Sequence, residues 1–184
     1  IDAYPVNEIA EAVEAVSQSD INALTDEYYE KYNIILEDRD PAEFRKHVEV
    51  QAGIEIGFER FLKEKNYQAI VTHFGDLGAL KQLPGLAIQR LMEKGYGFGA
   101  EGDWKSAALY RTVWYMNQGM TKGCSFVEDY TLNFDGANSS ILQSHMLEIC
   151  PMIAANKPSL EVHFLGIGIR KQMTARLVFT SKVG

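Results

Sequence analysis

Helix patterns alternate with strand patterns between residues 40 and 117, and this alternation limits the possible folds more than any other feature of the chain. One helix is predicted to begin after Asp40, which can cap it, because Pro41 suits the first helical position and Glu43 can complete a capping box. This helix should run to about Lys65. Other helices are predicted at 21–32, 84–94 and 104–117, with strands at 69–72 and 96–100. Such alternation is typical of a parallel, Rossmann-like α/β layer.

The pattern changes near Gly123, after which strand-like runs and turns replace the helices. The predicted strands are 127–134, 141–147, 160–165 and 177–179, and a turn is predicted at 135–138. We therefore expect an α/β domain at 1–123. The beginning of an antiparallel, β-rich, barrel-like domain is expected at 124–184, where it is incomplete.

Composition excludes some classes of function. The formal net charge of −7 does not favour nucleic acid or an anionic membrane as a partner. Two cysteines, Cys124 and Cys150, are too few for a disulfide framework and fit a reducing compartment such as the cytoplasm. No apolar run is long enough to span a membrane, and we expect no signal peptide among these residues. The chain opens at Ile1 rather than at Met, so we expect a piece of a longer protein.

An acidic residue stands where the second predicted strand gives way to a helix. Sites in parallel α/β sheets gather where strands end and helices begin. Glu101 lies at such a junction, and Gly99 and Gly102 give the backbone freedom to present it. The alternative is a solvated turn whose glycines serve geometry alone.

Two further runs carry polar side chains among apolar ones. Glu128 and Asp129 are neighbours in a strand pattern, so they face opposite sides, and one of them is expected at a polar site. An edge strand with both acids in solvent is the alternative. His145 lies in an apolar stretch, where a lone histidine also fits a structural role. Two carboxylates and one imidazole form a ligand set suited to a divalent cation such as manganese, cobalt or magnesium.

These runs, in this order and spacing, resemble the L-arabinose isomerase family, whose members interconvert L-arabinose and L-ribulose. The segments that carry the resemblance are 81–92, 101–108, 125–131, 144–151, 160–168 and 175–179. Segments of this length are far more specific than a lone glycine motif.

The resemblance implies a set of functional residues. Glu101, Glu128 and His145 match three of the family's four metal ligands, and the two glutamates are also its proton-transfer pair. The fourth ligand is a histidine that would fall beyond residue 184. Phe74 and Ile167 match positions that line the sugar pocket. The implied cofactor is Mn²⁺, or another divalent cation such as Co²⁺ or Mg²⁺.

The implied activity is aldose–ketose isomerisation by metal-assisted proton transfer through an ene-diol. L-Arabinose and D-galactose are the implied aldose substrates, giving L-ribulose and D-tagatose. Family members have three domains and assemble as hexamers, so this chain should span most of the middle domain and the start of the last. The 184-residue piece alone is expected to be inactive.

Two alternatives are a related isomerase for a sugar such as L-fucose, and a sugar-binding or assembly module without activity. A two-carboxylate glycosidase would need neither His145 nor a metal.

Overall fold

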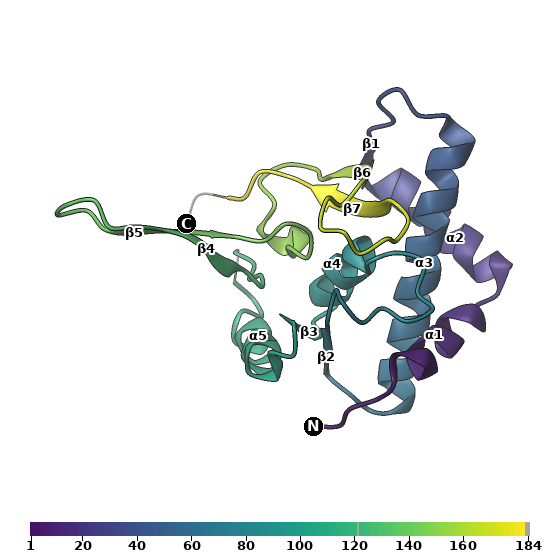
Figure 1. Ribbon diagram of the computed structural model, residues 1–184, viewed down its shortest axis with the longest axis horizontal. Helices are drawn as coiled ribbons and strands as arrows, with labels where there is room; N and C mark the ends of the chain where they lie inside the picture. The colour runs from purple at the N-terminus through teal and green to yellow at the C-terminus, as the bar shows by residue number, and fades with distance from the viewer. Residues whose placement is uncertain (121, 183–184) are drawn as a thin grey trace.

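Helices and strands follow one another through residues 1–120 and 122–182, the part of the chain that the computed structural model describes (Figure 1). The helices are α1 (Val6–Glu14), α2 (Gln18–Lys31), α3 (Pro41–Glu64), α4 (Gly85–Glu93) and α5 (Trp104–Met116), with a short 3-10 helix η1 (Pro151–Ile153). The strands are β1 (Asn33–Ile34), β2 (Ala69–Thr72), β3 (Gly97–Ala100), β4 (Glu128–Asn133), β5 (Ser140–Ser144), β6 (Ser159–His163) and β7 (Thr174–Val178). The pair β2–β3 is parallel, the pair β4–β5 is antiparallel, and β1, β6 and β7 form a mixed sheet. The predicted α/β class is therefore confirmed.

The long helix α3 runs through the body of the molecule and begins as the sequence predicts. The Asp40 side chain accepts hydrogen bonds from the backbone N–H groups of Ala42 and Glu43, both at 3.0 Å. Farther along α3, a Cβ atom on Gly57 would lie 2.6 Å from Cα of Val13. Glycine at this position therefore lets α1 lie directly against α3. None of the helices in the described ranges is long and apolar enough to cross a membrane.

The hydrophobic core joins segments from both sides of residue 123. β1 pairs in parallel with β6, so that Ile34 lies opposite Leu160. Leu160 and Leu177 are buried with Phe44 and other apolar side chains of α2 and α3. Strands β6 and β7 thus pack on the helices of the first part of the chain. The division of the chain into 1–123 and 124–184 stays a prediction.

The hairpin β4–β5 projects from the body as an arm (Figure 1). Its register places Glu128 opposite Ser144 at the base, with an irregularity between Asp129 and Thr131. β5 ends at Ser144, three residues earlier than predicted. His145 consequently lies in the turn that follows the strand, at the base of the arm.

Candidate active site

Glu101 occupies a tight turn between β3 and α5. Its φ is 55°, and the φ of Gly102 is 93°. The backbone N–H of Asp103 donates to the carbonyl of Ala100 at 2.9 Å, and that of Glu101 donates to the carbonyl of Thr72 at 2.7 Å. Two successive positive φ values are typical of a type I′ turn. A non-glycine residue held in this region costs on the order of 1–3 kcal/mol, and such positions cluster at functional sites. The hydrogen bonds on both sides of Glu101 keep it there and present its exposed side chain.

The start of α5 sits directly against β3 and fixes this turn. A Cβ atom on Gly99 would collide with the backbone carbonyl oxygen of Asp103. The Asp103 side chain caps α5 by accepting a hydrogen bond from the backbone N–H of Ser106 at 2.9 Å. Any larger residue at position 99 would push the helix away and move Glu101 with it.

The side chain of His145 is 10% exposed and lies between two acidic side chains. Its Nδ1 atom lies 3.1 Å from Oε2 of Glu148, and its Nε2 atom lies 3.9 Å from Oε2 of Glu128. The ring of Phe126 meets the imidazole nearly at right angles, with the ring centroids 5.1 Å apart. The backbone N–H of Glu148 donates to Nδ1 at 3.2 Å. Both the N–H and the carboxylate of Glu148 thus face Nδ1, which leaves Nε2 on the side of Glu128.

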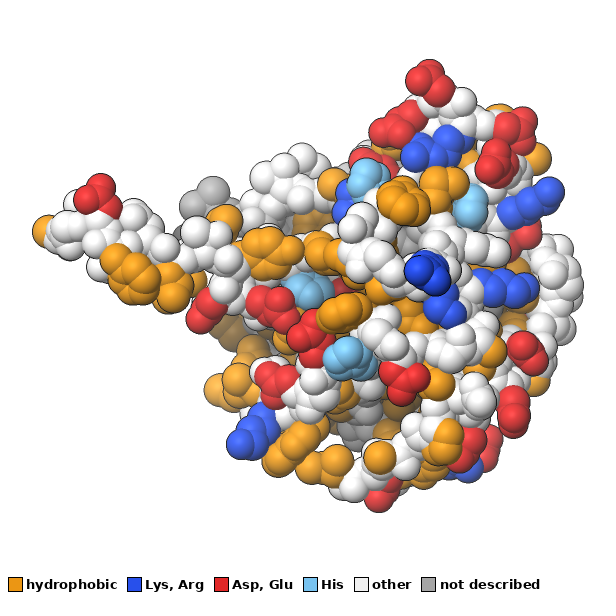
Figure 2. Space-filling view, in the orientation of Figure 1, with side chains coloured by type: hydrophobic (Ala, Val, Ile, Leu, Met, Phe, Trp, Pro, Cys, Tyr) orange, Lys and Arg blue, Asp and Glu red, His pale blue; other side chains and the backbone are white. Residues whose placement is uncertain are grey.

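The negative charges around His145 outweigh the effect of its burial. Burial lowers the pKa of the imidazole, whereas the hydrogen bond to Glu148 and the charges of Glu148, Glu128 and Glu101 raise it. The net pKa of His145 lies above its ordinary value. Figure 2 shows acidic side chains gathered near histidines where the arm meets the body. This part of the surface is therefore suited to attract a cation.

The side chains of Glu101, Glu128 and His145 offer carboxylate and imidazole groups, which are ligands suited to a divalent metal ion. A ligand atom lies about 2.1 Å from Mg²⁺, so two ligands of one such ion can be up to about 4.2 Å apart. The 3.9 Å between Glu128 and His145 is within that span. Glu101 acts on His145 through its charge. Within residues 1–120 and 122–182, no three His, Cys, Asp or Glu side chains are already arranged as a complete metal site. The convergence of Glu101 with the other two residues stays a prediction.

Phe74 and Ile167 lie in two loops that contact one another. Phe74 is 39% exposed and stacks on His73, with the ring centroids 5.0 Å apart. Ile167 is 38% exposed, in the loop between β6 and β7. Lys171, in the same loop, donates to the carbonyl of Gly78 at 2.7 Å. Both predicted pocket residues are accessible to a ligand.

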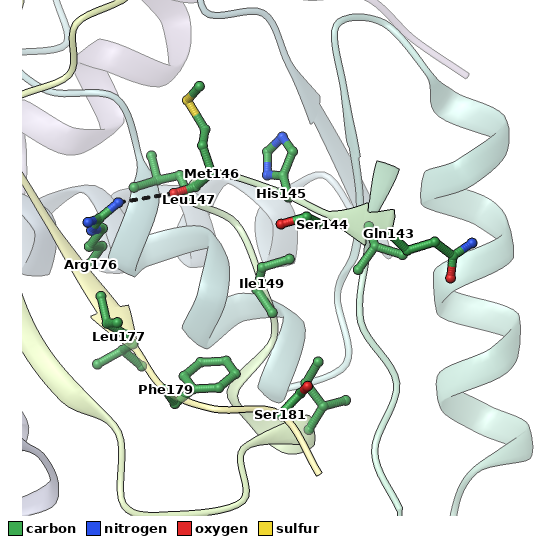
Figure 3. Close-up of a pocket in the computed structure, with 13 residues that line it drawn as sticks. Gln143, Ser144, His145, Met146, Leu147, Ile149, Arg176, Leu177, Phe179 and Ser181 are labelled. Atoms are coloured by element: carbon green, nitrogen blue, oxygen red, sulfur yellow. Dashed lines mark hydrogen bonds between the residues drawn. The ribbon is translucent and has the colours of Figure 1, made fainter. Parts of the chain in front are cut away.

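A cavity of about 290 Å³ lies beside the segment that carries His145 (Figure 3). It is lined by residues of the β5 end and the turn after it, and by residues of β7 and the segment that follows. Arg176 borders it and donates to the carbonyl of Met146 at 3.2 Å. In Figure 3 the imidazole of His145 points away from Ile149 and Phe179, which border the same cavity. His145 also borders the cavity, and its Nε2 atom lies 3.9 Å from Oε2 of Glu128.

Glu148 is a site residue that the sequence reasoning did not assign. Its side chain is 5% exposed and directed at His145. The sequence carried a signal, because an acid three residues after a histidine can reach the ring when the chain turns between them. The predicted strand at 141–147 argued against this contact, since a continuing strand would place His145 and Glu148 on opposite faces.

The fold and the site together define a mixed α/β protein in which two carboxylates, those of Glu128 and Glu148, flank the imidazole of His145. The chain belongs to the L-arabinose isomerase family. The family's central-domain model matches residues 1–119, and its C-terminal-domain model matches residues 123–184.

Individual relatives match along the whole chain. An L-arabinose isomerase of Bacteroides thetaiotaomicron is 60% identical over 191 residues, covering 100% of this chain and 37% of that protein. One from Phocaeicola vulgatus is 58% identical with the same coverage. One from Geobacillus thermodenitrificans is 48% identical, covering 100% of this chain and 36% of its own length. The chain therefore spans little more than a third of these relatives.

Proposed function

We propose that the whole protein is a metal-dependent aldose–ketose isomerase that converts L-arabinose to L-ribulose, and D-galactose to D-tagatose. The observation that carries the proposal is His145, held by Glu148 on one side and facing Glu128 on the other, in a chain that matches L-arabinose isomerases over its full length. The protein would work in the cytoplasm on small sugars and assemble as a hexamer.

The residues that would hold the metal are Glu101, Glu128 and His145, with Mn²⁺ as the first choice and Co²⁺ or Mg²⁺ as alternatives. When bound, the ion supplies a Lewis acid that stabilises negative charge developing on the sugar oxygens. The backbone N–H and the carboxylate of Glu148 both face Nδ1 of His145 and so hold the ring with Nε2 toward Glu128. Without a cation, the nearby carboxylates repel one another, so binding of the ion and ordering of the site are coupled.

Two carboxylates on separate elements are suited to the proton transfer. Glu101 comes from the turn after β3 and Glu128 from the first position of β4. One takes the proton from C2 of the open-chain aldose as the carbonyl oxygen O1 gains a proton, which gives the ene-diol. The other delivers a proton to C1 as the O2 hydroxyl loses its proton, which gives the ketose. Both can be reached from solvent, because Glu101 is exposed and the Glu128 side chain is 43% exposed. Phe74 and Ile167 would form apolar walls of the sugar pocket.

The proposal is tested by turnover of L-arabinose in heavy water by the whole protein with Mn²⁺. Proton transfer through a carboxylate should place deuterium at C1 of L-ribulose, because a carboxylic acid exchanges its proton with solvent. Glu128→Gln should abolish turnover. Asp129→Asn is the matched control, since it removes a neighbouring carboxylate that a strand turns to the other face.

Three results would contradict the proposal. Product without deuterium would indicate direct hydride transfer between the carbons. Preferred turnover of L-fucose would indicate the related isomerase. Binding of sugar without turnover of any aldose would indicate a non-catalytic module.

A further inference from the structure

Gln89 is a fully buried amide in the middle of helix α4, where its helical neighbours are also buried. Its Nε2 atom donates to the backbone carbonyls of Ile149 and Leu177, both at 3.0 Å. Its Oε1 atom accepts from the backbone N–H of Leu177 at 2.7 Å. A buried amide is costly unless it is hydrogen-bonded, and here both of its ends are used.

The bonds to Leu177 satisfy its backbone N–H and carbonyl on the edge of β7 that faces away from β6. Leu177 lies opposite Leu160 of β6, so β6 occupies the other edge of the strand. The Gln89 amide binds both the N–H and the carbonyl of Leu177, as a neighbouring strand would. Helix α4 is thereby fixed to the sheet at one defined position.

The bond to Ile149 reaches the turn that carries His145. Ile149 directly follows Glu148, whose carboxylate holds the imidazole of His145. The next residue, Cys150, is anchored separately, because its backbone N–H donates to Oγ of Ser125 at 2.8 Å. Gln89 therefore binds the carbonyl, and Ser125 binds the N–H, of the peptide group that joins Ile149 to Cys150. This peptide group lies at the end of the turn, one residue after Glu148.

We infer that Gln89 is a positioning residue for the metal site: through Ile149 it holds Glu148, and through Glu148 it holds His145 with Nε2 toward Glu128. This inference rests on the proposed function. Gln89 touches neither the proposed metal nor the sugar. Its effect is to keep the imidazole within reach of the ion, because a ligand that is free to move binds more weakly.

Gln51 provides a matched control for the loss of a buried amide. It is also fully buried, and its Nε2 donates to the carbonyl of Leu83 at 2.8 Å while its Oε1 accepts from the N–H of Ala87 at 3.1 Å. Its remaining partners are Gln82 and Thr174, so its bonds join α3 to the start of α4 and to β7. None of these partners is in the turn after β5. Replacement by methionine keeps the size of either side chain and removes its hydrogen bonds.

The test is a titration of the whole protein with Mn²⁺, in which electron paramagnetic resonance reports free and bound ion. We expect Gln89→Met to bind Mn²⁺ at least about tenfold more weakly than the unchanged protein and to alter the spectrum of the bound ion. Gln51→Met should bind within about twofold of the unchanged protein, although both variants lose thermal stability. If Gln89→Met does not fold, the shorter amides Gln89→Asn and Gln51→Asn should show the same order of affinity.

The outcomes separate the two claims. Equal Mn²⁺ affinity and equal spectra for the two variants, with binding intact in the unchanged protein, would overturn the role of Gln89 alone. Failure of the unchanged protein to bind Mn²⁺, Co²⁺ or Mg²⁺ would overturn both the proposed function and the positioning role that rests on it.

Discussion

The carboxylate of Glu148 lies 3.1 Å from Nδ1 of His145 at the base of the β4–β5 arm, where both side chains are at most 10% exposed. The backbone N–H of Glu148 also donates to Nδ1 at 3.2 Å, so Glu148 holds the direction of the ring by two contacts. One ligand of the proposed metal site, His145, is therefore already held in position by Glu148. The other two proposed ligands are the exposed pair of glutamates, Glu101 and Glu128.

Replacing Glu148 should weaken metal binding without removing a ligand. Glu148→Gln keeps the size of the side chain but removes its charge, so we expect about a 10–100-fold loss of Mn²⁺ affinity. Equilibrium dialysis of the whole protein measures this loss. Asp135→Asn, in the exposed turn of the hairpin, is the control for a lost negative charge. Equal affinities for the two variants would show that Glu148 does not support His145.

A second prediction concerns the buried ion pair between α3 and α4. The Glu55 carboxylate is fully buried, with Nε of Arg90 at 2.9 Å, Nζ of Lys94 at 2.8 Å and the hydroxyl of Tyr28 at 2.6 Å. Glu55→Gln removes the buried charge that Arg90 and Lys94 share and leaves them Glu27 and Glu59 as partners. Removing one member of a buried pair costs about 3–5 kcal/mol. The free energy of unfolding in urea should fall by that amount.

The control for this substitution is Glu64→Gln at the end of the same helix. The Glu64 side chain is 73% exposed, and exposed pairs contribute about 0–1 kcal/mol. A loss of stability for Glu55→Gln as small as that for the control would mean that the pairs with Glu27 and Glu59 suffice for Arg90 and Lys94.

A third prediction is the pH dependence of the thiol of Cys150. Burial raises its pKa to about 12, although the Tyr110 hydroxyl acts in the opposite direction. In the folded protein at pH 8 the thiol should be neutral and resist iodoacetamide, whereas in urea it should react readily. Mass spectrometry of the modified peptide gives the two rates.

The sign of the stability effect follows from the raised pKa. An unperturbed thiol has a pKa of about 8.5, so the unfolded chain loses this proton at lower pH than the folded protein. The stabilising contribution is present below about pH 8.5 and is lost as the pH rises toward 12. Modification of Cys150 at the same rate in folded and unfolded protein would contradict the buried placement.

Helix starts could be predicted where a capping side chain lies next to the helix in the sequence. The predicted cap at Asp40 is confirmed, and Asp103 caps α5 in the same way, because each carboxylate binds backbone N–H groups two or three residues away. Helix α2 begins at Gln18, three residues before the predicted start, because Ser17 supplies its cap. Helix α1 was not predicted, and it follows Pro5, which forms no side-chain cap.

Contacts between distant segments could not be predicted in this way. The strand β1 has two residues, and its partner β6 lies more than a hundred residues farther along the chain. Nothing in so short a segment marks it as a strand. At the candidate site, Glu101, Glu128 and His145 came from their types and spacing together with the family resemblance. Glu148 and Gln89 emerged only when the turn after β5 was seen in three dimensions.

The central claim is that Glu101, Glu128 and His145 bind one divalent metal ion. Its most direct test is an anomalous difference map from crystals of the whole protein grown with Mn²⁺. The account predicts a single peak about 2.0–2.3 Å from a carboxylate oxygen of Glu101, a carboxylate oxygen of Glu128 and Nε2 of His145. A peak bound by other residues, or side chains of these three that point apart with no peak between them in the assembled protein, would contradict it.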